Sequence, residues 1–280
     1  MAVTKILISV KTYPTLSKKY DELVCTAGFR EDGSWIRIYP IPYRKLQFTD
    51  RYKKWQWIEI DVVRNNKDFR KESFRPVNID SDIILGNIIG TDNYWDDRKK
   101  IVLKNVRYNM DELIEEAKNQ SIGTSLAVLK PKEIKDFIWE EEEREWDKDK
   151  LAVIYAHQRQ GNLFEQENKA TEKIFQVVKK LPYKFSYIFT TEDGKERTLM
   201  IEDWEVGVLY WNCLKQYGDE SIACQKVKEK YFDLMTKKCD LYFFLGTTKE
   251  YHNRSKNPFI IIGAFYPPKM PKATQLNFDI

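Results

Sequence analysis

The sequence predicts an α+β protein that is mostly β, with two domains or one large one in its 280 residues. In the first half, short segments that alternate apolar and polar residues are separated by turn residues, and they surround one small helix. This pattern favours a small Greek-key barrel over a parallel α/β sheet. In the second half, two helical segments lie between pairs of strand-like segments.

The first half is expected to contain mainly short strands. Residues 5–11 alternate as a half-buried strand does. Residues 22–39 are predicted to form a hairpin, because Asp32-Gly33 is a turn signal between two strand-forming runs. The remaining predicted elements of this half are strands at 52–63 and 101–108 and a helix at 111–118.

The second half has a clearer layout. A tight turn at 192–195 is expected to join strands at 183–190 and 196–201. Helices follow at about 203–217 and 219–237, the first capped by Asp203 and ended by Gly218. The final strands, 241–247 and 259–266, are apolar on both faces and are therefore predicted to be central and covered.

The composition argues against membrane-spanning, secreted and zinc-binding proteins. No apolar run approaches the roughly 20 residues of a membrane span, and the N-terminus alternates like a strand and not like a signal peptide, so we expect a cytoplasmic protein. The four cysteines lack C-x-x-C spacing, and the sequence holds only two histidines, so we expect buried reduced thiols and no structural zinc. No cofactor is implied.

The charge is unevenly distributed along the chain. Residues 1–80 carry 16 Lys or Arg and 10 Asp or Glu, whereas residues 81–150 carry 12 and 17. The basic first segment favours a polyanionic partner. The acidic run at 140–150 is the strongest change in composition. We place an N-terminal domain at 1–125 and a C-terminal domain at 126–280.

Several stretches together resemble a known family. They are ISVKTYP…VCTAGF…WIRIYPIPYRKL, SIGTSLAVLKPKEI and PYKFSYIF…MIEDWEVGVLYWNCL…LYFFLGTTKEYH…FIIIGAFYPPK. The chain thereby resembles an uncharacterised bacterial family described as a dual OB-containing domain, associated with mobile-element conflict and anti-phage defence loci. The resemblance implies two OB-like barrels, the second here with two added helices, and a nucleic-acid-binding role in such a system. It carries over no catalytic residue.

The segment 11–45 contains the main candidate binding site. Period-2 geometry places Trp35, Arg37 and Tyr39 on one face of a strand, with Ile36 and Ile38 on the core face. Bases stack on aromatic rings, and phosphates pair with cations. The flanking candidates are Lys11, Tyr13, Lys18, Lys19, Arg30, Arg44 and Lys45. The alternative is a face covered by another element, with Arg37 paired to a carboxylate such as Glu59 or Asp61.

A second set of candidates lies near the C-terminus. Arg254 and Lys256, in the polar loop before the last strand, are candidate anion contacts, and His252 is a weaker candidate for acid–base chemistry. The most probable function on these observations is sequence-tolerant binding of single-stranded DNA or RNA. Two alternatives stay open. One is a divalent-metal nuclease that uses Asp61, Asp203 and Glu205, although neither carboxylate pair has the Lys that a D…[DE]-x-K site needs. The other is a protein-interaction scaffold that uses exposed aromatics and residues 140–150, including Trp146.

Overall fold

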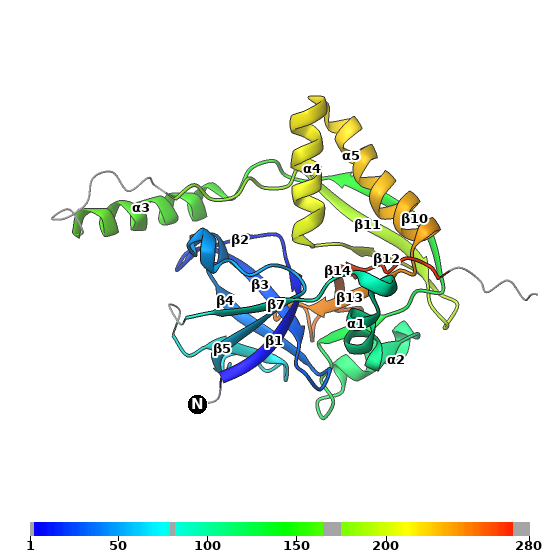
Figure 1. Cartoon of the computed structure of the whole chain (residues 1–280). Coiled ribbons are helices and arrows are strands. Elements are labelled where there is room, and N and C mark those ends of the chain that lie inside the picture. The colour runs from blue at the N-terminus through cyan, green and yellow to red at the C-terminus, as the bar shows by residue number, and fades with distance from the viewer. Residues whose placement is uncertain (1–2, 79–81, 165–174, 271–280) are drawn as a thin grey trace, which may run out of the picture.

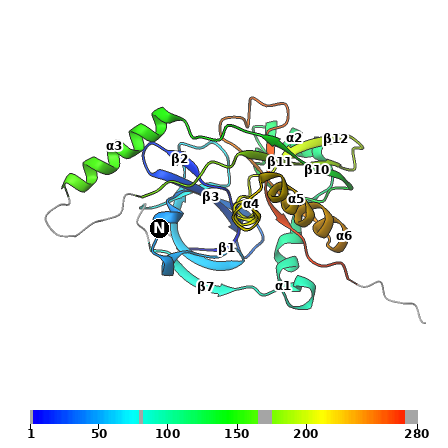
Figure 2. The same cartoon turned by 90° about the horizontal axis from the view of Figure 1, so that it is seen from above.

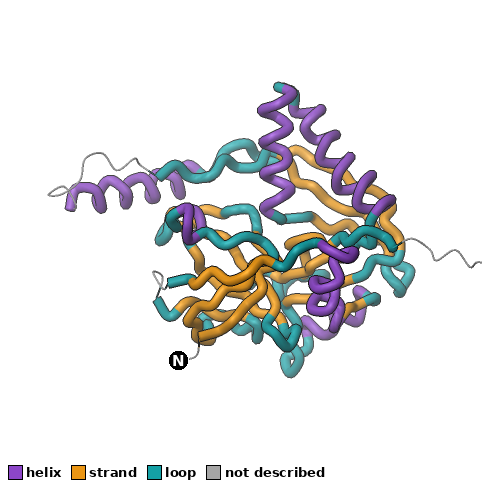
Figure 3. The backbone as a smooth tube through the Cα atoms, viewed as in Figure 1, coloured by secondary structure: helices purple, strands orange, loops and turns teal. Residues whose placement is uncertain are grey.

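The computed structural model describes residues 3–78, 82–164 and 175–270. Its strands gather in two groups that pack against each other, and helices cover the outer side of the second group (Figures 1 and 3). This confirms the prediction of a mostly β protein with two domains. None of the described helices is both long and apolar enough to cross a membrane.

The first group is a closed five-stranded barrel with OB-like strand order. Its order is β1-β3-β4-β6-β5, and β5 pairs with β1 to close the ring. Only β4 and β6 run parallel. The strands are β1 (Val3–Lys11), β3 (Asp21–Phe29), β4 (Trp35–Ile41), β5 (Gln56–Arg64) and β6 (Ser73–Pro76). Their alternating residues fill the interior with β-branched side chains, among them Ile6, Ile8, Val24, Ile36, Ile38, Ile58 and Ile60.

Two short strands extend this barrel. β2 (Thr15–Ser17) lies in the connection from β1 to β3 and pairs with β3, and β7 (Ile84–Ile88) pairs with β5. The predicted strand at 101–108 is wrong for most of its length. Residues 101–105 complete helix α1 (Asp92–Val102) and a 3₁₀ turn, and only β8 (Val106–Arg107) is a strand. A short apolar run is compatible with both the helical and the strand periodicity, and here Val102 is buried as part of the helix.

The second group consists of two sheets, β10-β11-β12 and β14-β13-β9-β8, and we call it the second barrel because its joint strand order matches that of the first. Here β9 and β10 act as one long first strand, β10 pairs with β11 and β11 with β12, and β9 pairs with β13 and β13 with β14. A parallel bridge between Ile201 and Ile261 links the end of β12 to β14. The strands are β9 (Leu126–Leu129), β10 (Glu133–Glu141), β11 (Tyr183–Thr190), β12 (Glu196–Met200), β13 (Tyr242–Thr247) and β14 (Phe259–Phe265).

The helices of the second barrel agree with the sequence signals. Asp203 caps α4 (Trp204–Tyr217), and Gly218, at a φ of 69°, ends it. Helix α5 (Glu220–Lys228) follows directly and continues through a π-helical turn, Glu229–Leu234, into α6 (Met235–Lys238). Helix α2 (Met110–Lys118) also packs on this barrel. The core between helices and sheet is aromatic, with Phe137, Phe185, Tyr187, Tyr210, Tyr231 and Phe243.

Helix α3 (Lys148–Phe164) was not predicted from the sequence. It follows the acidic run, within the connection from β10 to β11, and it leads away from the second barrel toward β2 of the first (Figure 2). His157 Nδ1 lies 3.1 Å from the carbonyl oxygen of Lys18, and Gln158 donates to Asp21 at 3.0 Å. The long connection of one barrel therefore contacts the short connection of the other.

An apolar interface joins the two barrels. Phe29 and Trp55 of the first barrel contact Phe244 of the second, at ring-centroid distances of 5.9 and 6.3 Å, and Trp55 also contacts Phe265 at 5.4 Å. The final strands are thus covered on both faces, as predicted from their composition. The four cysteines form no disulfide; Cys213, Cys224 and Cys239 are buried, whereas Cys25 is half-buried.

Candidate nucleic-acid interface

A basic groove opens on the first barrel between the outer face of β4 and two loops. The loops are the connection from β1 to β3, which contains β2, and the connection from β5 to β6. In an OB fold, these two loops and this face form the usual site for oligonucleotides. The groove encloses about 640 Å³. It is lined by Ser17, Lys19, Tyr20, Leu23, Tyr39, Pro40, Arg64, Asn65, Asn66, Lys67, Asp68, Arg70, Arg75 and Lys249.

The groove is strongly cationic. Six of its lining residues are Lys or Arg and one, Asp68, is a carboxylate. Lys19, Lys67 and Lys249 are exposed and form no ion pair within the described part of the chain. Lys249 comes from the loop between β13 and β14, so the second barrel contributes a cation to the groove of the first.

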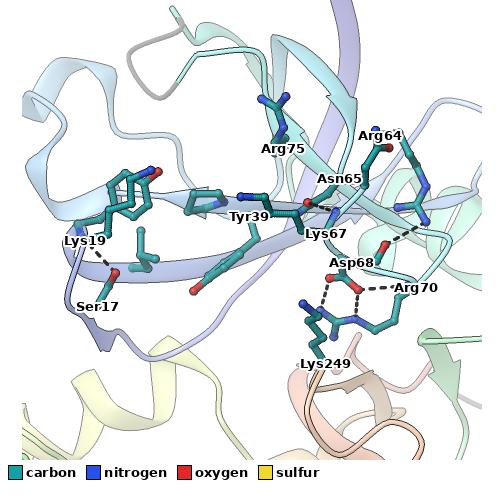
Figure 4. Close-up of a pocket in the computed structure, with 14 residues that line it drawn as sticks. Ser17, Lys19, Tyr39, Arg64, Asn65, Lys67, Asp68, Arg70, Arg75 and Lys249 are labelled. Atoms are coloured by element: carbon teal, nitrogen blue, oxygen red, sulfur yellow. Dashed lines mark hydrogen bonds and ion pairs between the residues drawn. The ribbon is translucent and has the colours of Figure 1, made fainter.

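Tyr39 supplies an aromatic surface between these cations. Its side chain is 39% exposed and lies between Lys19 and the Asp68–Arg70 pair (Figure 4). Tyr20 lies beside it at the groove, and the Lys19 ammonium is 5.0 Å from the Tyr20 ring centroid. A flat ring with flanking ammonium groups is the arrangement on which a base stacks while its phosphates are neutralised.

Asp68 and Arg70 form a buried wall of the groove. Arg70 donates to Asp68 through Nε at 2.9 Å and Nη2 at 2.6 Å, and it also donates to the carbonyl oxygen of Thr247 in the second barrel. Burial by itself would raise the pKa of Asp68, but the hydrogen bonds and charge of Arg70 lower that pKa to about 2. The charges of Asp68 and Arg70 largely compensate each other, and the bond from Arg70 to Thr247 holds the β5–β6 loop against the second barrel.

Trp35, Arg37 and Tyr39 do not form an open platform. Only Tyr39 faces the groove. Trp35 packs against Phe29 and Phe244, at centroid distances of 4.0 and 5.4 Å. Arg37 is 2% exposed and donates hydrogen bonds to Ser73, Ser125 and Thr247. The second barrel covers this face, as the alternative interpretation of the sequence expected. The partners of Arg37 are, however, hydroxyl and carbonyl oxygens and not the carboxylates of Glu59 or Asp61.

Lys11 and Tyr13 are partly buried against neighbouring elements. The Lys11 ammonium lies 4.5 Å from the Tyr43 ring centroid and 5.6 Å from that of Trp204, and burial lowers the pKa of Lys11 to about 8. The Tyr13 hydroxyl donates to the carbonyl oxygen of Lys179 and accepts from Trp211, both at 2.8 Å. Both residues tie the β1–β3 connection to neighbouring elements, and neither faces the groove.

The remaining cations predicted near this site have different surroundings. Arg30 donates to the carbonyl oxygen of Trp35 at 3.1 Å and lies over the Phe74 ring. Arg44 pairs with Glu22 at 2.6 Å and Lys45 with Asp21 at 2.7 Å, so both are partly neutralised. Lys18 is exposed beside Lys19 but does not line the groove.

The C-terminal candidates occupy the loop that carries Lys249. Arg254 and Lys256 are exposed, and Arg254 lies 3.8 Å from the carboxylate of Glu250. His252 is buried. Its Nε2 donates to the carbonyl oxygen of Ala117, its Nδ1 lies 2.8 Å from the Thr247 hydroxyl, and burial lowers its pKa. This histidine therefore supports the loop through its two ring nitrogens.

Two of the three carboxylates considered for a metal site are paired with a lysine. The Lys54 ammonium lies 3.4 Å from Asp203 and 3.0 Å from Glu205, and Asp203 also caps α4. Asp61 lies on β5, opposite Val3 of β1. Over the described residues, no three His, Cys, Asp or Glu side chains gather as a metal site requires. In the acidic run, Arg144 pairs with Glu220, and the Trp146 indole donates to the carbonyl oxygen of Val178.

Sequence reasoning missed the cations on the β5–β6 loop and on the two strands that flank it. Arg64, Lys67 and Arg75 belong to a polar stretch without clear periodicity, and nothing in it indicates which strand face it lies beside. The available signal was positional, because in an OB-type barrel this loop and the first loop flank the same face. Lys249 carried no such signal, since it reaches the groove only through the packing of the two barrels.

The chain matches two adjacent family models. One, described as domain of unknown function DUF8758, covers residues 2–104, and the other, described as domain of unknown function DUF8757, covers residues 106–279. No curated protein is significantly similar to the chain. The models meet before β8, which pairs with β9 of the second barrel, and Met110 and Leu113 of α2 lie in the core of that barrel. This junction precedes the boundary at 125 expected from the sequence.

Proposed function

We propose that this chain, which belongs to the family described as domain of unknown function DUF8757, binds single-stranded nucleic acid in the basic groove of its first barrel. The observation that carries the proposal is the placement of Tyr39 among Lys19, Lys67 and Lys249, on the face and loops that OB barrels use for oligonucleotides. A base stacks on the tyrosine ring, and the lysines neutralise the phosphates on either side.

The composition of the groove favours a sequence-tolerant interaction. Long, flexible lysines contact phosphates without geometric selectivity, and every base offers a π face to an aromatic ring. Arg64 and Arg70 are committed to carbonyl oxygens and Asp68, so they are not free to read base edges. The setting in bacterial defence, and any partner subunit, rest on the family resemblance alone and stay predictions.

Fluorescence anisotropy with labelled oligo(dT) and oligo(U), titrated at several salt concentrations, tests the proposal. Phosphate contacts make affinity fall with salt by roughly 0.7 log units per log unit of salt for each contact. A triple variant, Lys19→Glu, Lys67→Glu and Lys249→Glu, is expected to weaken binding strongly and to reduce the slope by about 2. The ratio of the two affinities identifies DNA or RNA as the ligand.

The matched control changes the same charge elsewhere. Lys118, Lys135 and Lys215 are exposed on α2, β10 and α4 and do not line the groove, so replacing all three by Glu should reduce affinity much less. Equal losses from the two triple variants would mean that net charge alone attracts the polyanion. Absence of binding by the unaltered protein would reject the proposal, and magnesium-dependent cleavage of the oligonucleotide would instead support the nuclease alternative.

A further inference from the structure

A second, smaller pocket lies between the two barrels. It encloses about 250 Å³ and is bounded by residues of β11 and β12, by the start of α4, and by the β1–β3 and β10–β11 connections. The connection of the first barrel contributes Tyr13, Pro14 and Thr15, and that of the second contributes Glu142, Trp146, Lys180 and Leu181. We call this cavity the Glu202 pocket. It is the counterpart on the second barrel of the basic groove on the first, since strands 2 and 3 of an OB fold again form its floor.

The walls of the Glu202 pocket are rich in aromatic rings. Four aromatic side chains line it, Tyr13, Trp146, Tyr183 and Phe185, and the polar atom of each of the first three already has a partner outside the pocket. The Tyr13 hydroxyl bonds Lys179 and Trp211, the Trp146 indole donates to Val178, and the Tyr183 hydroxyl donates to Glu220. Met200, Leu181 and Val206 complete an apolar lining. A volume below about 300 Å³ suits a single flat ring system and not a larger ligand.

Glu202 is the unusual group in this pocket. Its side chain is half-buried, and across the described part of the chain its carboxylate has neither a hydrogen-bond donor nor an ion-pair partner. Burial alone raises its pKa. The lysines at the rim are paired with other carboxylates, Lys180 with Glu143 at 3.4 Å and Lys184 with Glu140 at 2.7 Å. A half-buried carboxylate without a protein partner can accept hydrogen bonds from the donors of a ligand.

We infer that the Glu202 pocket binds a guanine base, with Glu202 accepting hydrogen bonds from the Watson–Crick edge and the aromatic walls stacking on the ring. This inference deepens the proposed function. It rests on that function where the guanine belongs to a bound nucleic-acid strand. An ionised carboxylate offers two acceptors and no donor. Guanine alone among the common bases places two donors, N1–H and the N2 amine, side by side on that edge. In adenine and cytosine a ring acceptor adjoins the single amine, and in uracil two carbonyls flank the single N–H.

Isothermal titration calorimetry with the four ribonucleoside monophosphates tests the base preference. We expect GMP to bind at least tenfold more tightly than AMP, CMP or UMP. IMP, which lacks the N2 amine, should have an intermediate affinity. Glu202→Gln should weaken GMP binding at least tenfold, because the amide turns one acceptor into a donor that faces a donor of guanine. Glu196→Gln, at an exposed position on β12 that does not line the pocket, should leave GMP binding unchanged.

A second arm separates this inference from the proposed function. Oligo(dT) and an oligo(dT) with one central guanine are titrated against the unaltered protein and Glu202→Gln. We expect the guanine to increase affinity, and this gain to be lost in Glu202→Gln while binding of oligo(dT) stays the same. GMP binding without oligo(dT) binding would reject the proposed function and leave a pocket for free guanine nucleotides. Equal affinity for the four monophosphates, or a Glu202→Gln variant that binds GMP normally, would overturn the inference.

Discussion

The guanidinium of Arg37 in the first barrel donates to the hydroxyl of Ser125 at 3.0 Å and to its carbonyl oxygen at 3.2 Å, just before the first strand of the second barrel. The same side chain reaches the carbonyl oxygen of Thr247. One arginine on an outer strand face therefore bonds polar groups at one end of the neighbouring barrel's antiparallel pair, β9 and β13, where Leu126 lies opposite Gly246. This connection makes the relative placement of the barrels specific, because an apolar interface alone has no preferred register.

Arg37→Met should destabilise the protein, and it should not alter the groove directly because Arg37 does not line it. The substitution removes the four hydrogen bonds that Arg37 donates to Ser73, Ser125 and Thr247 in the interior, for an expected loss of about 2 to 4 kcal/mol in the free energy of unfolding. Urea denaturation measures this loss. Arg254→Met, at an exposed arginine, should change stability by less than about 0.5 kcal/mol. A stable Arg37→Met variant with impaired oligonucleotide binding would instead restore this residue to the binding surface.

Tyr39→Ala should weaken binding of oligo(dT) by about 1 to 3 kcal/mol, the usual contribution of one stacked base, with little change in melting temperature. Tyr217→Ala, at a similarly exposed tyrosine on α4, serves as the control for binding. Trp35→Ala should behave in the opposite way, since removal of its ring from the interface destabilises the fold by about 3 kcal/mol. If Tyr39→Ala binds normally, no base stacks on this ring.

Gly207→Ala should be destabilising although it replaces a glycine within a helix. A Cβ at this position would lie 2.4 Å from two ring carbons of Tyr13. Overpacking costs about 1 to 3 kcal/mol, which exceeds the gain of about 1 kcal/mol from replacing glycine by alanine in a helix. In a double-mutant cycle, Tyr13→Ala should remove this cost. Additive effects of the two substitutions would contradict the proposed contact.

The Asp68–Arg70 pair should contribute to the stability of the fold in acid. The pKa of Asp68 is lowered from 3.8 to about 2 in the folded protein, so the folded state binds this proton less readily than the unfolded state does. The contribution, about 2 kcal/mol, is therefore present above about pH 4 and is lost as the pH falls toward 2. Asp68→Asn should flatten the dependence of unfolding free energy on pH in this window, as measured by urea denaturation. Asp149→Asn, at an exposed position on α3, should not.

Local patterns in the sequence were sufficient to predict most of the secondary structure. The hairpin around Asp32-Gly33 and the helix capped by Asp203 and ended by Gly218 depend on turn and cap chemistry that neighbouring residues determine. Strand periodicity likewise placed Ile36 and Ile38 in the core. It failed at 101–108, where a short apolar run is compatible with both helix and strand and burial of Val102 decides between them.

The sequence by itself determined which strand face carries Trp35, Arg37 and Tyr39, because side chains alternate along any extended backbone. Only the tertiary structure decided which of the three meet solvent. The second barrel covers the first two through Phe244, Ser125 and Thr247, residues 88 to 210 positions away in the chain, and it leaves Tyr39 open beside Lys19, Lys67 and Lys249. Contacts over such separations follow from the packing of whole barrels, and no local pattern records them.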